Sequence, residues 1–460
     1  MSRVVVISNR VPDPRSEEVA GGLAVGVRSA LRGSGGLWFG WSGDEGRADE
    51  APGVFTHDGI RYVTVDLSSE EIRGYYNGFC NNALWPLFHY LLGFLKYDRR
   101  EFELYLRVNA RFARTLLPRL EPDDIIWVHD FHLIPLGSEL RRLGAKQPIG
   151  FFLHTPFPDY DVLRALPVHR EMLRSLCAYD VVGFQTEPDL HSFQNCLTSA
   201  GLSPIDRADR RSTPRSSPHP NSEVFPIGID VEECARQAVA SVTPRPEVTV
   251  ASFGGRTLVL GVDRLDYSKG LPERFRSFER LLELYPEHQG QLVLTQIAPP
   301  TRQGVRAYAE IRQTLEQLSG SINGRFAQLD WFPIHYLNQG MPRERLLGIM
   351  RGAQVGLVTP IRDGMNLVAK EYVAAQDPDD PGVLVLSDLA GAACELTDAV
   401  LVNPYDLDGV ADALHQAIQM PVEERRQRHA AMMSILRKND VHAWSSRFVQ
   451  SLRECAASGA

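Results

Sequence analysis

The strongest constraint on this chain is its alternation of short apolar runs, rich in Val, Ile and Leu, with longer amphipathic segments. Such runs are typical of strands buried on both faces of a parallel sheet, and the amphipathic segments are long enough to be crossover helices. The pattern therefore predicts an α/β fold with doubly wound parallel sheets. The expected strands are residues 4–7, 125–128, 149–153, 181–184 and 224–227, then 257–262, 292–296, 355–359, 383–386 and 400–402. The expected helices include residues 102–117, 135–143, 271–285, 304–318, 342–350 and 367–376.

The alternation is interrupted between the two sets of strands. Residues 202–222 are rich in Pro, Ser and Arg, which predicts an exposed loop, and residues 238–246 are a second candidate boundary. At 460 residues the chain is longer than one core usually supports. We predict Rossmann-like domains at residues 1–240 and 241–440, each binding ligands at the carboxyl ends of its strands.

The overall composition excludes several classes of partner. A net charge of -8 gives no electrostatic reason to expect binding to nucleic acid or an anionic membrane. The six cysteines are scattered and never form a C-x-x-C pair, which indicates reduced residues rather than disulfides or a zinc site. Because no apolar stretch has the length of a signal-peptide core or a membrane span, we expect a cytoplasmic protein.

Chemically suggestive residues follow several strands of the first half. Arg10 ends the first strand and could grip a phosphate, and the Gly21–Gly22 pair could let a ligand approach the backbone. A solvated arginine and a glycine turn are the alternative. Asp130 and His154 follow two neighbouring strands and could bind hydroxyls and manage a proton, or merely cap the next turn.

Aromatic residues form two further clusters, one around Trp41 and one from Tyr76 to Trp85. Flat rings with polar edges suit a sugar site, although core packing is the more common use of such residues. His129 and His132 flank Asp130, but no further Cys or His completes the spacing of a metal site.

The second half contains the strongest signal. Arg264 and Lys269 bracket a turn between a strand and a helix start, an arrangement that suits a diphosphate. Asp363 precedes another helix, where the amides of residues 364–367 could face an anion, and Glu371 lies further into that helix. The alternative is ordinary helix capping and pairing. Arg302 follows a third strand, so four cations, counting Arg10, could balance a diphosphate and a phosphomonoester.

Taken together, the motifs resemble the bacterial trehalose-6-phosphate synthases, which are retaining glycosyltransferases of the GT-B fold. The resemblance covers nearly the whole chain in order. It is carried by SNR at Ser8, GGLWFGW, LWPLFHY, YLRVNA, DDIIWVHD, IGFFLHTPFP, GFQTE, PIGID, RLDYSKGLPERF, TQIAP, RDGMNLVAKEYVAAQ, PGVLVLS and VNPYD. It implies two Rossmann-like domains facing across a cleft, with a C-terminal helix, residues 441–460, crossing back to the first domain.

The resemblance also implies residue roles. The acceptor, glucose 6-phosphate, is expected at Arg10, Trp41, Tyr76, Trp85, Asp130 and Arg302. The nucleotide-sugar donor is expected at Gly21, Gly22, His154, Arg264, Lys269, Met341, Asp363, Gly364, Met365, Asn366, Leu367, Val368, Ala369, Lys370 and Glu371. Arg264, Lys269, His154 and Asp130 are the residues expected to take part in catalysis.

The implied reaction moves glucose from a nucleotide sugar, with UDP-glucose expected, to glucose 6-phosphate. The departing diphosphate accepts the acceptor's proton, so no dedicated carboxylate nucleophile is needed. Neither a cofactor nor a metal is expected. We also expect a homo-oligomer, with a tetramer as one option, and a separate trehalose-phosphate phosphatase acting downstream. The alternatives are a sister enzyme with another acceptor, such as glycerol 3-phosphate, and a catalytically silent sugar-phosphate sensor.

Overall fold

The chain divides into two compact units. The first comprises Met1–Ile227 with Val441–Ala460, and the second comprises Gly228–Asp440. The predicted boundary at residue 240 is too late, because helix α9 (Val231–Val242) packs on helices of the second unit. The computed structural model describes residues 2–14, 27–28, 31, 35–47, 50–202, 220–242, 255–302 and 305–458. Most of the predicted 202–222 loop lies outside these residues.

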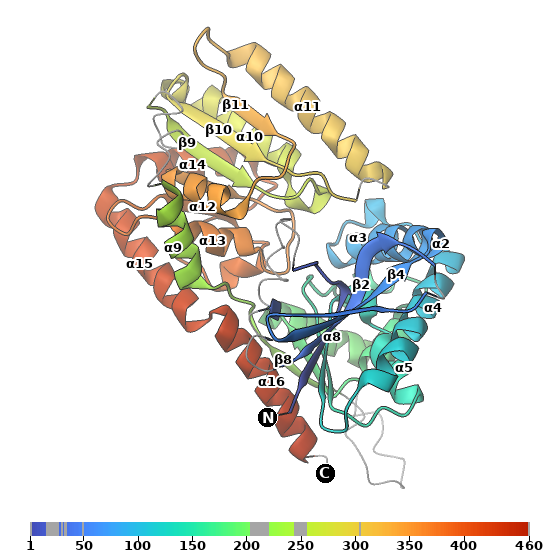
Figure 1. The fold of residues 1–460 in the computed structure, drawn as a ribbon. Coiled ribbons are helices and arrows are strands. Elements are labelled where there is room, and N and C mark those ends of the chain that lie inside the picture. The colour runs from blue at the N-terminus through green and yellow to red at the C-terminus, as the bar shows by residue number, and fades with distance from the viewer. Residues whose placement is uncertain are drawn as a thin grey trace. The chain divides into compact units, whose positions relative to one another are not determined.

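The first unit is built on an eight-stranded sheet (Figure 1). Its strands, in spatial order, are β3 (Gly53–His57), β4 (Ile60–Leu67), β2 (Leu37–Glu45), β1 (Val4–Arg10), β5 (Ile125–His129), β6 (Ile149–Phe152), β7 (Val181–Phe184) and β8 (Asn221–Val224). All neighbours are parallel except β3 and β4, which form an antiparallel hairpin. An Asp-Gly turn joins the two strands of that hairpin, with φ of 48° at Asp58 and 74° at Gly59. Asp-Gly favours a tight hairpin turn, so the sequence contained a signal for this hairpin that the strand pattern did not use.

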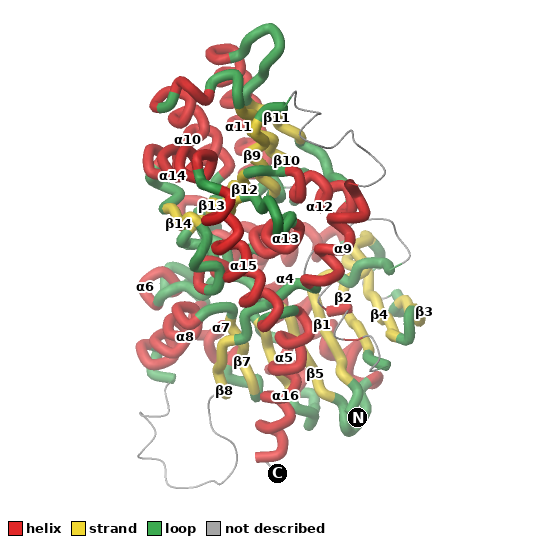
Figure 2. Tube along the Cα trace, turned by 90° about the vertical axis from the view of Figure 1, so that its left-hand side faces the viewer, coloured by secondary structure: helices red, strands yellow, loops and turns green. Residues whose placement is uncertain are grey.

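Helices cover both faces of the first sheet (Figure 2). Along β6, Gly150 would place a Cβ atom against Phe448, whereas Phe151 contacts Tyr179, whose hydroxyl accepts from the Gly137 amide. Alternate residues thus face α16 (Val441–Ser458) and α5 (Leu136–Arg142). The other helices of this unit whose bounds fall within the described residues are α2 (Ser69–Glu71), η1 (Ile72–Leu84), α3 (Trp85–Phe88), η2 (Leu92–Phe94), α4 (Arg99–Leu116), η3 (Leu117–Arg119), η4 (Phe131–Leu133), α6 (Tyr160–Leu163), α7 (His169–Leu176) and α8 (Glu187–Ser199).

The second unit has a six-stranded parallel sheet. Its spatial order is β11 (Ile334–Leu337), β10 (Leu292–Ile297), β9 (Thr257–Val262), β12 (Val355–Val358), β13 (Val383–Ser387) and β14 (Val400–Val402). This is the order of a dinucleotide-binding Rossmann fold. The remaining elements are η8 (Tyr267–Lys269), α10 (Leu271–Leu284), η9 (Pro286–His288), α11 (Arg306–Phe326), α12 (Arg343–Gly352), α13 (Leu367–Ala375), η10 (Gly391–Cys394), α14 (Leu407–Gln419) and α15 (Val422–Lys438).

The helices of the second unit form two groups. Helix α10 packs on α11 and α14, and α9 packs on α12 and α13. None of the helices in the described ranges is long and apolar enough to cross a membrane. The predicted α/β fold class, with two doubly wound units, is confirmed. The sequence patterns missed β2, β3, β4 and β11, and they placed β8 three residues too late.

The strand order places several of the predicted site residues beside the points where the order of the strands in each sheet reverses. In the first unit this switch lies between β1, which ends at Arg10, and β5, which precedes Asp130. In the second it lies between β9, which precedes Lys269, and β12, which precedes Asp363. Ligands of doubly wound folds bind at such switch points.

Backbone strain marks some of the same places. Five described residues other than glycine have a positive φ, and three of them are predicted site residues, namely Asp130 at 74°, Arg302 at 46° and Asn366 at 76°. Such conformations cost energy and are concentrated at binding and catalytic sites.

Candidate active site

The loop after β9 is shaped by its own side chains. Asp266 Oδ1 accepts a hydrogen bond from the Ser268 amide at 3.0 Å and starts the short turn that ends at Lys269. Gly270 follows with a φ of 63°, and a Cβ atom there would lie 2.6 Å from the carbonyl oxygen of Thr359. Only glycine fits this close approach, so the loop brings Lys269 against the residues that follow β12.

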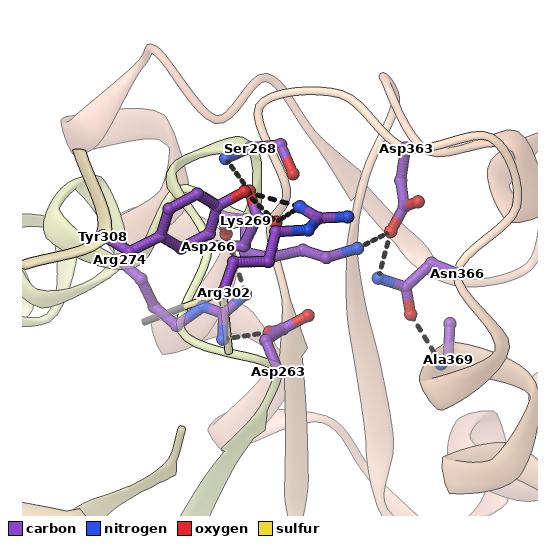
Figure 3. A network of polar contacts seen from close by, with 10 residues as sticks. All are labelled: Asp263, Asp266, Ser268, Lys269, Arg274, Arg302, Tyr308, Asp363, Asn366 and Ala369. Atoms are coloured by element: carbon purple, nitrogen blue, oxygen red, sulfur yellow. Dashed lines mark hydrogen bonds and ion pairs between the residues drawn. The ribbon is translucent and has the colours of Figure 1, made fainter. Parts of the chain in front are cut away.

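The ammonium group of Lys269 forms an ion pair with Oδ2 of Asp363 (Figure 3). The same oxygen accepts a hydrogen bond from Asn366 Nδ2 at 3.0 Å, and Asn366 Oδ1 caps α13 by accepting from the Ala369 amide at 3.2 Å. The structure therefore brings together two predicted donor-binding residues that lie 94 positions apart in the sequence.

The start of α13 also offers backbone donors. Among the described residues, none accepts a hydrogen bond from the amides of Gly364, Met365 or Leu367. Amides at a helix start attract negative charge, because the peptide dipoles of the helix point the same way. The loop can therefore hold an anion beside the Lys269–Asp363 pair.

Behind this pair lies Arg274, a buried arginine that the sequence analysis did not identify. Its Nη1 donates to Asp263 Oδ2 at 2.7 Å and to Gln296 Oε1 at 2.9 Å, and its Nε donates to Thr359 Oγ1 at 3.0 Å. One side chain thus joins the ends of β9, β10 and β12. A signal was present, because Arg274 occupies the i+3 position of the apolar stripe of α10 formed by Leu271, Phe275 and Phe278.

Arg302, predicted to bind phosphate, is also held by a carboxylate. Its Nη1 donates to Asp266 Oδ2 at 2.8 Å, and the Tyr308 hydroxyl donates to the same oxygen at 3.1 Å. Burial alone would raise the pKa of Asp266, but the positive charges of Arg302 and Arg264 outweigh burial and lower this pKa to about 2. Asp266 is therefore ionised at neutral pH and fixes the position of Arg302.

This network, which includes Arg264, carries a small excess of positive charge. Arg264, Lys269, Arg274 and Arg302 provide four cations, and Asp263, Asp266 and Asp363 provide three anions. The side chains of Lys269, Arg274 and Arg302, each paired with one of these carboxylates, have exposed fractions of 9%, 0% and 5%, whereas Arg264 is exposed. Bound anions would consequently meet a prearranged site in which Arg264 is the most accessible cation.

The far end of the predicted donor site is ordered by two further ion pairs. Glu371 is paired with Arg343 at the start of α12, a partner that the sequence analysis did not anticipate. Lys370 is fully buried and donates to Glu395 at 2.5 Å, so only its backbone remains for a ligand. Met341 and Val368 are partly exposed, and Ala369 is buried.

The predicted residues of the first unit form a separate cluster. Trp41 lies opposite Arg10 in the β1–β2 register, and its ring contacts that of Tyr76 edge to face at 5.3 Å. Tyr76 stacks on His132 at 6.1 Å, and Nδ1 of His132 lies 3.8 Å from Oδ2 of Asp130. A series of neighbouring residues thus leads from Arg10 through Trp41, Tyr76 and His132 to Asp130.

Asp130 in turn contacts the loop after β6. Its Oδ1 accepts from the His154 amide at 3.3 Å, and Nε2 of the His154 ring lies 3.0 Å from Nδ1 of His129. Trp85 is 5% exposed and packs on His89 and Phe131, which places it largely in the core. Gly21 and Gly22 lie outside the described residues.

One group of potential metal ligands occurs elsewhere in the described part of the chain. Glu287, His288 and His415 place one ligand atom each within 4.8 Å of one another. His288 ends η9, four residues before the first residue of β10, whereas Lys269 and Asp363 follow the strands β9 and β12. The group thus lies near the amino end of β10, and the predicted site lies at the carboxyl ends of the strands.

Comparison with known proteins places these features in a family. A model of Glycosyltransferase family 20 matches residues 6–454. The chain therefore belongs to glycosyltransferase family 20. It is 50% identical to the trehalose-6-phosphate synthase of Cronobacter sakazakii over 456 residues, which cover 99% of this chain and 96% of that protein.

Solved structures agree with this assignment. The crystal structure of a UDP-forming alpha,alpha-trehalose-phosphate synthase from Burkholderia vietnamiensis matches with a TM-score of 0.94 and 50% identity, covering 100% of this chain and 98% of that one. A second such enzyme, from Burkholderia xenovorans in complex with glucose-6-phosphate, matches with a TM-score of 0.91 and 48% identity. That match covers 98% of this chain and 100% of the other.

The buried arginine makes a prediction about stability. Replacing Arg274 with Met should destabilise the second unit by about 3–5 kcal/mol, because Asp263 would be left buried without its partner. The double variant Arg274→Met with Asp263→Asn should be less destabilised than Arg274→Met alone, since no charge then remains buried. Urea unfolding of the wild-type protein, the single variant and the double variant measures their free energies of unfolding. A double variant at least as unstable as the single one would contradict the proposed electrostatic cause.

Proposed function

We propose that this protein is a retaining glucosyltransferase that transfers glucose from UDP-glucose to glucose 6-phosphate, giving α,α-trehalose 6-phosphate and UDP. The observation that carries the proposal is the Lys269–Asp363 ion pair beside the start of α13. It provides a cation for a leaving diphosphate and a carboxylate for sugar hydroxyls in one place. Family membership and the named activities of the relatives support the same reading.

In the proposed mechanism the cations of the second unit act on the leaving group. Lys269 and Arg264 hold the diphosphate and stabilise the negative charge that grows as the bond to the glucose carbon breaks. The acceptor hydroxyl attacks that carbon from the face of the leaving group, and its proton passes to the departing phosphate oxygen. Asp363 and the amides of Gly364 to Leu367 orient the glucose, and Glu371, paired with Arg343, holds the ribose.

The acceptor is assigned to the cluster of the first unit, and a role for Arg302 in binding its phosphate stays a prediction. Arg10 binds its phosphate, Tyr76 and Trp41 pack against it, and Asp130 accepts from a sugar hydroxyl. The relative from Burkholderia xenovorans was solved with glucose-6-phosphate, which supports this choice over glycerol 3-phosphate. The predicted homo-oligomer and the downstream phosphatase stay predictions.

The decisive experiment is an assay of the purified protein. UDP-, GDP- and ADP-glucose are each offered with glucose 6-phosphate or glycerol 3-phosphate, and NMR identifies the products and their anomeric configuration. The expected result is trehalose 6-phosphate from UDP-glucose with retained configuration. Absence of any transfer, or transfer to glycerol 3-phosphate alone, would overturn the proposal.

Replacing Lys269 with Ala should lower kcat about a hundredfold or more, because the growing charge on the diphosphate loses a donor that acts mainly in the transition state. Lys438→Ala, at an exposed position near the end of α15, is the matched control and should retain full activity. Steady-state kinetics with UDP-glucose and glucose 6-phosphate measures both variants. Near-normal turnover of Lys269→Ala would remove this residue from catalysis.

Replacing Arg10 with Ala should raise the KM for glucose 6-phosphate about tenfold or more and change kcat less, because a charge-assisted contact to the phosphate is lost. The exposed Arg61 on β4 provides the control, Arg61→Ala, which should leave this KM unchanged. If KM for glucose 6-phosphate is the same in the wild-type protein, Arg10→Ala and Arg61→Ala, Arg10 does not bind the acceptor.

A further inference from the structure

Two histidines face each other at the ends of neighbouring strands of the first unit. His129 ends β5, His154 follows β6, and Nδ1 of His129 lies 3.0 Å from Nε2 of His154. His129 is fully buried, with its ring centroid 4.6 Å from that of Trp127 and 6.2 Å from that of Trp444. His154 is only half-buried, and among the described residues its Nδ1 has no hydrogen-bond partner.

Both rings are neutral at physiological pH. Burial lowers the pKa of His129 well below its usual value, and the neighbouring His154 lowers it further. Burial also lowers the pKa of His154 to about 3. Each neutral imidazole has one N–H and one acceptor nitrogen, so a single proton lies between the two rings.

The surroundings of Nε2, the other ring nitrogen of His129, indicate which ring carries that proton. Its Nε2 is buried and has no hydrogen-bond partner within the described residues. If His154 donated to His129, this Nε2 would carry a buried N–H without an acceptor. If His129 donates from Nδ1, the same Nε2 is a lone pair. Orphaned buried N–H groups are rarer than under-satisfied acceptors, so donation from His129 is favoured.

The surrounding rings support the same assignment. Nε1 of Trp127 and Nε1 of Trp444 are also buried without a partner in the described part of the chain, and the two indole rings lie 4.8 Å apart. An indole nitrogen can only donate. A lone pair on His129 therefore suits this environment, whereas a third N–H would add another donor with nothing to accept it.

We propose that His129 is a positioning residue that donates a hydrogen bond from Nδ1 to Nε2 of His154 and thereby holds His154 as a neutral donor with its proton on Nδ1. His154 then offers an N–H to an oxygen of the bound sugar and moves no proton itself. The identity of that ligand as the UDP-glucose donor rests on the proposed function, but the tautomer does not.

The tautomer is tested directly by NMR of the full-length protein labelled with ¹⁵N-histidine. The two neutral tautomers give different patterns of coupling between ring nitrogens and ring protons, and the His154 signals are identified by their loss in His154→Asn. We expect the Nδ1–H form at His154. An Nε2–H form in the wild-type protein would overturn the inference, as would an unchanged Nδ1–H preference in His129→Leu.

Kinetics provides a second test with matched variants. In His129→Asn the side-chain amide takes the place of Nδ1–H and can still donate, whereas in His129→Leu no donor remains and in His129→Gln the amide lies beyond that place. We expect kcat/KM for UDP-glucose to fall about tenfold or more in the Leu and Gln variants and to stay near normal in His129→Asn. KM for glucose 6-phosphate should change little in all three.

The NMR and kinetic measurements test the role of His129 and the proposed function separately. Equal losses in the Asn and Leu variants would show that His129 acts through packing alone and would overturn its positioning role. His191→Leu, at an exposed position on α8, is the control and should behave as wild type. A wild-type protein without synthase activity would refute the proposed function, while the NMR measurement would still decide the tautomer.

Discussion

The second unit depends on the buried ion pair between Arg274 and Asp263. Burial raises the pKa of Asp263, which shows the cost of a carboxylate there, and the guanidinium group offsets part of that cost. Because Arg274 also bonds to residues of β10 and β12, the pair is satisfied only when all three strands are in place. If one of these strands were out of place, the loop that carries Lys269 would lose its support.

Pairing of cations with carboxylates continues beyond the buried Arg274–Asp263 pair. Lys269 and Arg302 have carboxylate partners as well, so the site is nearly neutral before a ligand arrives. Holding several cations together without such partners would cost repulsion and desolvation. A ligand must then offer both anionic oxygens for the cations and hydroxyls for a carboxylate such as Asp363, and a sugar diphosphate has both. The pairing thus favours nucleotide sugars over simple phosphates.

Much of this arrangement was visible in the sequence, and the parts that were not have physical causes. Parallel strands made of continuous Val, Ile and Leu runs, such as β1, β5 and β9, were predicted well, because such runs have no other stable place. Strand β2 was missed because Trp38, Phe39 and Trp41 suit a sugar site as well as a core strand. The sequence also identified Lys269 and Asp363. For Arg274 it offered only a charged position in the apolar stripe of α10, because the partners of Arg274 and of Arg343 are set by contacts formed in the folded chain.

The two units differ in how they would handle charge under the proposed function. The second gathers cations and carboxylates, because a diphosphate gains negative charge during the reaction. His154 in the first unit is set among aromatic rings and kept neutral by burial. A protonated imidazole would be an additional cation and could give its proton to a ligand, whereas a neutral N–H can only bind. Keeping His154 neutral therefore fits a reaction in which the leaving group itself accepts the proton.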